Sequence, residues 1–219
     1  MKILTTLCCM LFLIQCNRCN ENNSKKTRIQ TTMNTTANSS SSAMDTATLA
    51  GGCYWCLEAI FQRLQGVEKV TSGFCGGQVK NPSYKAVCTG TTGHAEVIQL
   101  TYDSSVISFA EILKVFFTMH DPTTLNRQGN DVGTQYRSAI FYHNTTQKKE
   151  AEEIIHALNM ASVYSTPIVT TVEPFDVFYI AEDYHQNYYN DNSNEGYCRY
   201  VIQPKLEKFE KVFSDKLKK

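Results

Sequence analysis

The chain has 219 residues, of which 42% are hydrophobic and 19% are charged, so it is long enough to bury one substantial core. Twenty-one basic residues balance twenty-one acidic ones, and the formal net charge at pH 7 is zero. No strongly basic block is present, which excludes the phosphate-neutralising surface that nucleic-acid binding requires. We therefore expect one folded domain whose partners are peptides and other proteins.

The first 16 residues predict a signal peptide or a membrane anchor. Lys2 precedes an apolar run from Ile3 to Ile14, which is short for a bilayer span but has the length of a signal-peptide core. The stretch 13–16 only loosely resembles a lipoprotein cleavage box. The sequence therefore predicts a secretory or extracytoplasmic protein. A mitochondrial presequence, and a cytosolic product that starts at Met33 or Met44, are the other interpretations.

Residues 17–44 consist mainly of Asn, Ser, Thr and Lys. Such a segment buries too little apolar surface to offset the entropy of ordering, so it predicts a flexible linker. We expect the folded domain to occupy residues 45–219.

Helix and strand patterns alternate along this domain. The apolar segment Thr46–Ala50 predicts a strand. The spacing of Leu57, Ile60, Phe61 and Leu64 then predicts a helix over about residues 53–65.

The second half of the domain continues this alternation. Ala95–Tyr102 alternates as a strand does, and Ser108 with Glu111 forms a capping box at the start of a helix. The later patterns predict four further elements: a strand over about 136–143, a helix over about 148–160, a strand over 167–172 and an amphipathic segment after residue 204. These elements indicate an α+β fold without internal repeats.

Residues 51–56, Gly-Gly-Cys-Tyr-Trp-Cys, place Cys53 where the first strand turns into the first helix. Unsatisfied backbone N–H groups and the helix dipole favour a thiolate at that point. We therefore expect the Cys53 pKa to lie below the free-cysteine value of about 8.5. Cys53-x-x-Cys56 alone is also compatible with half of a zinc site or with a thioredoxin-type redox pair. Because no second such pair completes four ligands, we expect no metal.

The nine cysteines fall into two groups. Four lie in the leader, at Cys8, Cys9, Cys16 and Cys19. Five lie in the domain, at Cys53, Cys56, Cys75, Cys88 and Cys198. An odd number in the domain argues against a fully paired disulfide scaffold and for at least one free or cycling thiol.

Glu96 lies in the predicted strand 95–102, on the same face as Ile98, Leu100 and Tyr102. If that face is buried, the carboxyl loses hydration, its pKa rises and it can act as a general acid. The other interpretation is a carboxylate on a solvent-exposed face, and strand parity alone does not separate the two.

Taken together, the motifs resemble those of A-type peptide methionine sulfoxide reductases. The resemblance runs from about residue 49 to 199, in the order GGCYWC at 51–56, SGFCGG at 72–77, GHAEV at 93–97, HDPTT at 120–124, NDVGTQYRSAIF at 130–141, AEDYHQNYY at 181–189 and GYC at 196–198. It implies a ferredoxin-like α+β core with long loops. It also implies stereospecific reduction of methionine S-sulfoxide in proteins, peptides and free methionine.

The resemblance also implies roles for individual residues. Cys53 matches the nucleophile and Glu96 the acid. Tyr54 and Trp55 match the pocket for the substrate methyl group. The polar shell around the sulfoxide oxygen matches Tyr84, Tyr136 and Asp131. Tyr54 departs from the usual phenylalanine, which makes the methyl pocket slightly more polar if its hydroxyl points inward.

The same resemblance implies how the enzyme is regenerated. Cys198 matches a recycling cysteine, and its Gly/Asn/Ser-rich surroundings suggest a flexible segment that can approach Cys53. We expect Cys198 to be the main resolving thiol and Cys56 to be an alternative or a relay. The reductant is expected to be thioredoxin or another dithiol, without a metal or organic cofactor, and the protein is expected to be a monomer. Cys75 and Cys88 match no catalytic role.

Two other function classes remain to be weighed. A thioredoxin-like thiol–disulfide oxidoreductase would account for the Cys53–Cys56 spacing, but it has no use for Glu96 beside two tyrosines. A noncatalytic binding module would retain the core pattern and lose the nucleophile or the acid, and this chain has both. Stereospecific turnover of methionine sulfoxide separates the reductase from both.

Overall fold

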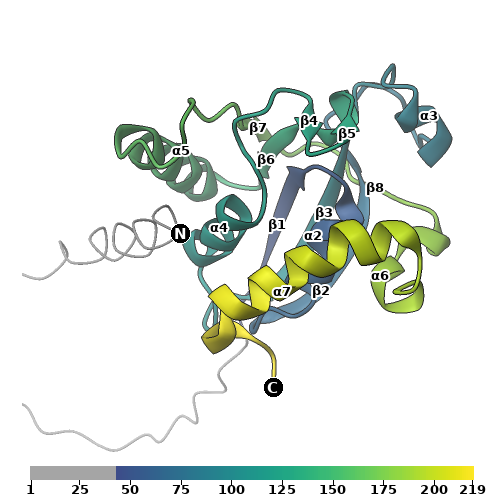
Figure 1. Ribbon diagram of the computed structural model, residues 1–219. Coiled ribbons are helices and arrows are strands. Elements are labelled where there is room, and N and C mark those ends of the chain that lie inside the picture. Colours follow the sequence, from purple (N-terminus) through teal and green to yellow (C-terminus); the bar gives the residue numbers. More distant parts are fainter. Residues whose placement is uncertain (1–42) are drawn as a thin grey trace, which may run out of the picture. The chain divides into compact units, whose positions relative to one another are not determined.

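Strands far apart in the sequence meet in one six-stranded sheet, as the computed structural model shows (Figure 1). The structure describes residues 43–219. The strand order is β7-β6-β1-β3-β2-β8. The bounds are Met44–Gly51 for β1, Val67–Cys75 for β2, Ala95–Asp103 for β3, Ser138–Tyr142 for β6, Thr171–Pro174 for β7 and Tyr179–Ile180 for β8.

The pairing is antiparallel throughout the sheet except between β6 and β7, which run parallel. A separate two-stranded ribbon pairs β4 (Arg127–Gln128) with β5 (Asp131–Val132). The register of the central pair matters for function, because Leu49 of β1 lies opposite Ile98 of β3. Glu96, two residues before Ile98, therefore lies beside the point where β1 ends.

The helices vary in length from one turn to four. The α-helices are α2 (Tyr54–Phe61), α3 (Tyr84–Cys88), α4 (Phe109–Met119), α5 (Thr145–Met160), α6 (Tyr188–Asp191) and α7 (Gln203–Val212). Three 3-10 turns, η1 (Thr134–Tyr136), η2 (Asp183–His185) and η4 (Ser214–Lys216), and the π-helix η3 (Cys198–Ile202) complete the set.

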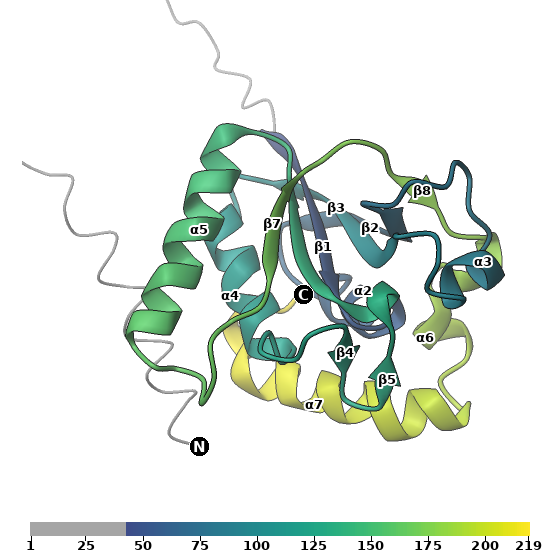
Figure 2. The same cartoon turned by 90° about the horizontal axis from the view of Figure 1, so that it is seen from above.

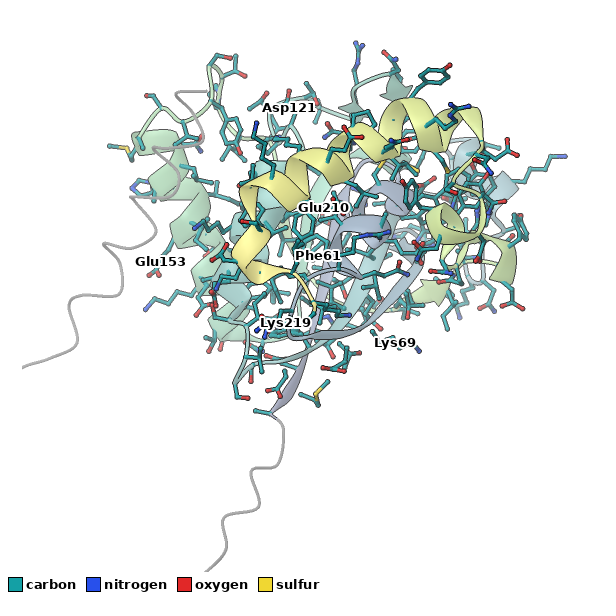
Figure 3. All side chains as sticks on the ribbon, turned by 60° about the horizontal axis from the view of Figure 1, so that its bottom comes forward. Phe61, Lys69, Asp121, Glu153, Glu210 and Lys219 are labelled. Atoms are coloured by element: carbon teal, nitrogen blue, oxygen red, sulfur yellow. The ribbon has the colours of Figure 1, made fainter. Side chains whose placement is uncertain are left out.

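Helices α2 and α7 pack against each other, and α2 contacts the central strands β1, β2 and β3 (Figures 1 and 2). Helix α7 also reaches α4, because the Lys208 ammonium donates to the Thr118 carbonyl at 2.7 Å. Figure 3 shows Phe61, at the end of α2, beneath the α7 ribbon, whereas Lys69 and Glu153 lie at the periphery. Phe61 is completely buried. This packing holds the start of α2 rigidly against the sheet.

A second apolar cluster surrounds the ends of the strands. It comprises Ala50, Cys75, Ala95, Val97, Ala139 and Phe141, with Phe175 and Phe178 packed on it. Both faces of the sheet are therefore buried around residues 95–97, which explains why β3 reads as apolar on both faces at its start.

Most predicted elements are confirmed, with shifted ends. The capping box at Ser108 is present, with the serine hydroxyl accepting from the Glu111 N–H and the Glu111 carboxylate accepting from the Ser108 N–H. The predicted helix over 53–65 is too long, because α2 ends at Phe61. The chain then turns through Gly66, which has a φ of +87°. The predicted strand over 167–172 begins four residues later, at Thr171.

The main element that the patterns did not predict is β2, which lies between β3 and β8 in the sheet. After the buried Val67 it has two exposed charged residues, Glu68 and Lys69, and it ends with four buried residues, 72–75. That shift from exposed to fully buried along one strand removes the alternation on which strand prediction depends. The predicted signal or anchor (1–16), residues 17–42 of the predicted linker and the alternative start Met33 lie outside the described residues. Within residues 43–219, no helix has both the length and the apolar character of a membrane span.

Candidate active site

The turn between β1 and α2 positions the predicted nucleophile. Gly52 has a φ of +92°, and a Cβ at that position would lie 2.5 Å from the Gln128 side chain. Only glycine fits this turn without strain. Cys53 follows as the N-cap of α2 in an extended conformation, and its carbonyl accepts from the Cys56 N–H at 3.1 Å. The Cys53 thiol therefore lies at the helix N-terminus, as the sequence predicts.

Cys53 and Cys56 form a buried pair of thiols, 7% and 1% exposed. Burial is the main cause that raises the pKa of Cys53, and the hydrogen bond from Cys56 and the charge of Glu96 raise it further. The hydrogen bond with Cys53 lowers the pKa of Cys56 to about 7. The prediction of a lowered pKa for Cys53 is therefore wrong for the substrate-free site. Desolvation outweighs the helix N-terminus at Cys53 in this site.

Glu96 is the buried acid that the site requires. It is 1% exposed, and its Oε2 accepts a hydrogen bond from the Tyr54 N–H at 3.1 Å. Burial raises its pKa from 4.5 to about 8. The prediction that this face of the strand is buried is confirmed, and the interpretation of Glu96 as an exposed rim carboxylate is wrong. At neutral pH the carboxyl is mostly protonated and can donate a proton.

Two tyrosines predicted to hold the sulfoxide oxygen lie around this acid. Tyr84 begins α3, where its N–H donates to Glu182 Oε1 at 3.0 Å, and Tyr136 ends η1. Burial is the main cause that raises the pKa of both phenols. Both therefore stay protonated and serve as hydrogen-bond donors. Asp131, the third predicted polar residue, lies in β5.

The two aromatic residues after Cys53 take different places. Tyr54 is fully buried, and its ring packs against Phe74 and His185. Among the described residues its hydroxyl has no hydrogen-bond partner. Trp55 is half-buried and stacks face to face on Tyr188, with ring centroids 3.7 Å apart and planes 7° apart. Trp55 therefore forms the accessible aromatic wall, and Tyr54 supports it from beneath.

The third cysteine expected near the site is ordered and buried. Cys198 is 0% exposed and begins the π-helix η3, which continues directly into α7. Residues 198–202 are helical, and the flexibility expected of the Gly/Asn/Ser-rich segment around Cys198 stays a prediction. The exposed, polar residues 193–196 that suggested flexibility lie just before this helix.

The other two cysteines of the domain stand apart from this pair. Cys75 is fully buried in β2, and Cys88 is exposed at the end of α3. All five cysteines of residues 43–219 carry free thiols. The same part of the chain contains no cluster of His, Cys, Asp and Glu suited to hold a metal ion.

Three residues at the site were not singled out from the sequence. Tyr197 donates from its hydroxyl to Asp131 Oδ2 at 2.8 Å. Tyr188 covers Trp55, and the carboxylate of Glu58 holds the segment that carries it by accepting from the N–H groups of residues 187 and 188, at 2.9 and 3.2 Å. Tyr188 and Tyr197 lie in the motifs AEDYHQNYY and GYC, so the sequence could have pointed to them. The motifs gave them no role, because neither residue is a nucleophile or an acid.

Comparison with known proteins agrees with this geometry. The family model described as peptide methionine sulfoxide reductase matches residues 45–217. The peptide methionine sulfoxide reductase MsrA of Saccharolobus solfataricus is 57% identical over 175 residues, covering 80% of this chain and 98% of that protein. The MsrA of Leptospira borgpetersenii is 58% identical over 169 residues, covering 77% and 95%.

Solved structures give the same result. The reduced form of Mxr1 from Saccharomyces cerevisiae matches with a TM-score of 0.65 and 36% identity, over 73% of this chain and 90% of that one. Methionine sulfoxide reductase A of Corynebacterium diphtheriae matches with the same TM-score and identity, over 74% and 80%. The predicted α+β fold is therefore confirmed. The thiol pair, the buried acid and these matches show that the chain belongs to the peptide methionine sulfoxide reductase family, in its A type.

Proposed function

We propose that this site reduces the S epimer of methionine sulfoxide in proteins, peptides and free methionine. Cys53 is the nucleophile and Glu96 the acid. The observation that carries the proposal is the hydrogen bond from the Tyr54 N–H to Glu96 Oε2 at 3.1 Å. It fixes a buried carboxylic acid beside the residue that follows the nucleophile. Reduction of a sulfoxide needs both groups, since sulfur must be attacked while oxygen is protonated.

In the first step Cys53 gives its proton to the Cys56 thiolate and attacks the sulfoxide sulfur, and the neutral carboxyl of Glu96 gives its proton to the oxygen. Tyr84 and Tyr136 donate hydrogen bonds to that oxygen, and Trp55 lines the side of the methyl group. These donors stabilise the charge that develops on oxygen. The hydroxyl then moves from the substrate sulfur to the Cys53 sulfur, as the S–O bond and the bond between the two sulfurs break, which leaves a sulfenic acid on Cys53 and releases the methionine thioether.

In the second step the thiol of Cys56 attacks the sulfenic sulfur, forming a Cys53–Cys56 disulfide and releasing water. The Cys198 thiolate next attacks the Cys56 sulfur, which frees Cys53 and moves the disulfide to Cys56–Cys198. A thioredoxin-like dithiol finally reduces that disulfide. One observation supports the first step of this relay: the Cys56 N–H donates to the Cys53 carbonyl at 3.1 Å, which keeps the two cysteines side by side at the start of α2. In this scheme Cys56 is the relay, and Cys198 holds the disulfide that the reductant meets.

Turnover of resolved S- and R-methionine sulfoxide, with dithiothreitol as reductant, tests the reaction. We expect reduction of the S epimer alone, abolished by Cys53→Ser. Tyr200→Phe is the control, because that side chain is 81% exposed, and it should retain full turnover. A folded protein that reduces neither epimer but catalyses thiol–disulfide exchange would instead support the thioredoxin-like alternative.

Trapping of the oxidised enzyme tests the relay. One equivalent of S-sulfoxide, without reductant, should give a Cys56–Cys198 disulfide in the wild type and a Cys53–Cys56 disulfide in Cys198→Ser. A Cys53–Cys198 disulfide in the wild type would contradict the relay and place Cys56 off the pathway.

We further propose that the protein is exported as a monomer and repairs oxidised proteins outside the cytosol. The apolar run Ile3–Ile14 supports export. Sequencing of the mature N-terminus from fractionated cells tests this proposal. A mature chain that retains Met1, or begins at Met33 or Met44, in the cytosolic fraction would contradict it. Size-exclusion chromatography with light scattering tests the oligomeric state.

A further inference from the structure

The hydroxyl of Tyr197 lies between two parts of the site that have separate tasks. It donates to Asp131 Oδ2 at 2.8 Å, and the same oxygen lies 3.8 Å from the Cys56 sulfur. The ring stands edge-on to Trp55, with centroids 6.0 Å apart and planes 74° apart. One phenol therefore contacts the carboxylate of the polar shell, the thiol pair and the aromatic wall.

A phenol has one hydrogen to donate and an oxygen that can accept. When the hydrogen points to Asp131, the oxygen can accept from a thiol S–H. When the pair loses its proton, the hydrogen can turn to the thiolate. Burial, and then the negative charges of Cys53 and Cys56, raise the pKa of Tyr197. The phenol thus keeps its hydrogen through the reaction, and its hydrogen bond favours the thiolate form of both cysteines.

The chain ties this phenol to the recycling thiol. Tyr197 directly precedes Cys198 and has helical backbone angles, φ −61° and ψ −42°, at the start of η3. The Arg199 N–H donates to the Glu195 carbonyl at 3.0 Å, so helical hydrogen bonding spans both residues. Their Cα atoms are about 3.8 Å apart. Because Cys198 is fully buried, a movement that brings its sulfur to Cys56 also moves Tyr197. π-helical turns are often found at functional sites.

We propose that Tyr197 is a positioning residue that holds Asp131 and the thiol pair in the arrangement that reduces the sulfoxide. The inference rests on the proposed function for its role in turnover. Its effect on the thiol pair is independent of the substrate.

The test compares the full-length wild type with Tyr197→Phe, which removes only the hydroxyl. Tyr200→Phe is the matched control, because Tyr200 lies in the same π-helix and is 81% exposed. The first readout is the rate constant of a single turnover of S-methionine sulfoxide without reductant. Loss of a hydrogen bond to a charged group should slow it about tenfold in Tyr197→Phe and leave Tyr200→Phe unchanged.

The second readout needs no sulfoxide. Iodoacetamide labelling of the peptide that carries Cys53 and Cys56, followed by mass spectrometry from pH 5 to 10, gives the pH midpoint of the pair. We expect Tyr197→Phe to raise this midpoint by about one pH unit. Asp131→Asn should lower it, because the phenol hydrogen is then free for the thiolate and a negative charge is lost. A purely structural role for Tyr197 would not produce opposite shifts.

The two variants combined test whether Tyr197 acts through Asp131. In the Asp131→Asn background, Tyr197→Phe should slow single turnover by clearly less than its factor in the wild type. An equal factor in both backgrounds, or a wild-type midpoint and rate in Tyr197→Phe, would overturn the proposal. If Tyr197→Phe does not fold by circular dichroism, Tyr197→Leu, which also lacks the hydroxyl, replaces it in both readouts with the same expected results and the same refuting outcomes. A wild type inactive on sulfoxide would refute the proposed function, and the labelling midpoints would still decide the inference.

Discussion

Replacing Glu96 by glutamine should stabilise the fold while it removes the acid. Glutamine keeps an oxygen that can accept the Tyr54 N–H and resembles the neutral carboxyl in size. Unlike the glutamate carboxylate, glutamine carries no negative charge that must be neutralised by a proton when the chain folds. The neutral carboxyl is needed for chemistry, but keeping it neutral inside the protein has a cost that depends on pH.

The size of that cost follows from the pKa, which burial raises from 4.5 to about 8. The unfolded chain releases the proton above pH 4.5 and the folded chain holds it until about pH 8. Stability contributed by this group therefore falls as pH rises between those values. At pH 7 the difference amounts to about 3 kcal/mol, and at pH 5 to less than about 1 kcal/mol. Glu96→Gln should be more stable than wild type by these amounts.

Urea unfolding at pH 5, 6 and 7 measures the difference in stability, and turnover is measured separately on the wild type and on Glu96→Gln with Cys53 retained. In the unfolding measurements both proteins should carry Cys53→Ser, so that titration of the thiol pair does not contribute. Glu152→Gln is the exposed control, with a side chain 55% exposed, and should change stability little at any pH. Glu58→Gln is the buried contrast. It loses one of two backbone hydrogen bonds to its carboxylate and should be destabilised by about 1–3 kcal/mol.

The reasoning is refuted if the difference in free energy of unfolding between Glu96→Gln and the wild type does not grow from pH 5 to pH 7. A loss of stability at pH 7 would also refute it. Either result would mean that Glu96 is ionised in the folded protein and cannot donate a proton near neutral pH. Loss of turnover in Glu96→Gln is expected in every case, so turnover alone does not test the stability argument.

Three further predictions concern the surroundings of the thiol pair. Tyr54→Phe removes a buried hydroxyl that has no hydrogen-bond partner among the described residues. Thermal unfolding should therefore show a variant as stable as the wild type or more stable, by up to about 2 kcal/mol, and turnover should be retained. A clear loss of stability would show that the hydroxyl has a partner. Gly52→Ala forces alanine into a φ of +92° and against the Gln128 side chain. Urea unfolding should show a free energy of unfolding lower by about 1–3 kcal/mol, and turnover should fall. Wild-type stability and turnover would contradict the strain at this turn. Burial raises the pKa of Cys75 to about 11, so at pH 8 iodoacetamide should label exposed Cys88 well before Cys75, and equal labelling would show that β2 opens.

The sequence alone could predict the residues that carry out the chemistry. GGCYWC places a cysteine at a strand-to-helix turn, and the parity of β3 puts Glu96 on the same face as Ile98 and Leu100, although the burial of that face is known only from the structure. Local patterns suffice for such features, because a helix start and a strand face depend on neighbouring residues. The capping box at Ser108 was predictable for the same reason, since its hydrogen bonds span only three residues.

Only the tertiary structure decided how these residues act on one another. The β1–β3 register brings Glu96 to the end of β1, and the packing that buries Cys53 reverses the pKa expected from its helix position. Tyr197 meets Asp131 across 66 residues of sequence. Desolvation and long-range hydrogen bonds depend on which distant segments exclude water from a site. The nucleophile and the acid can therefore be recognised in the linear sequence, but their protonation states and partners are set by the packing of the whole domain.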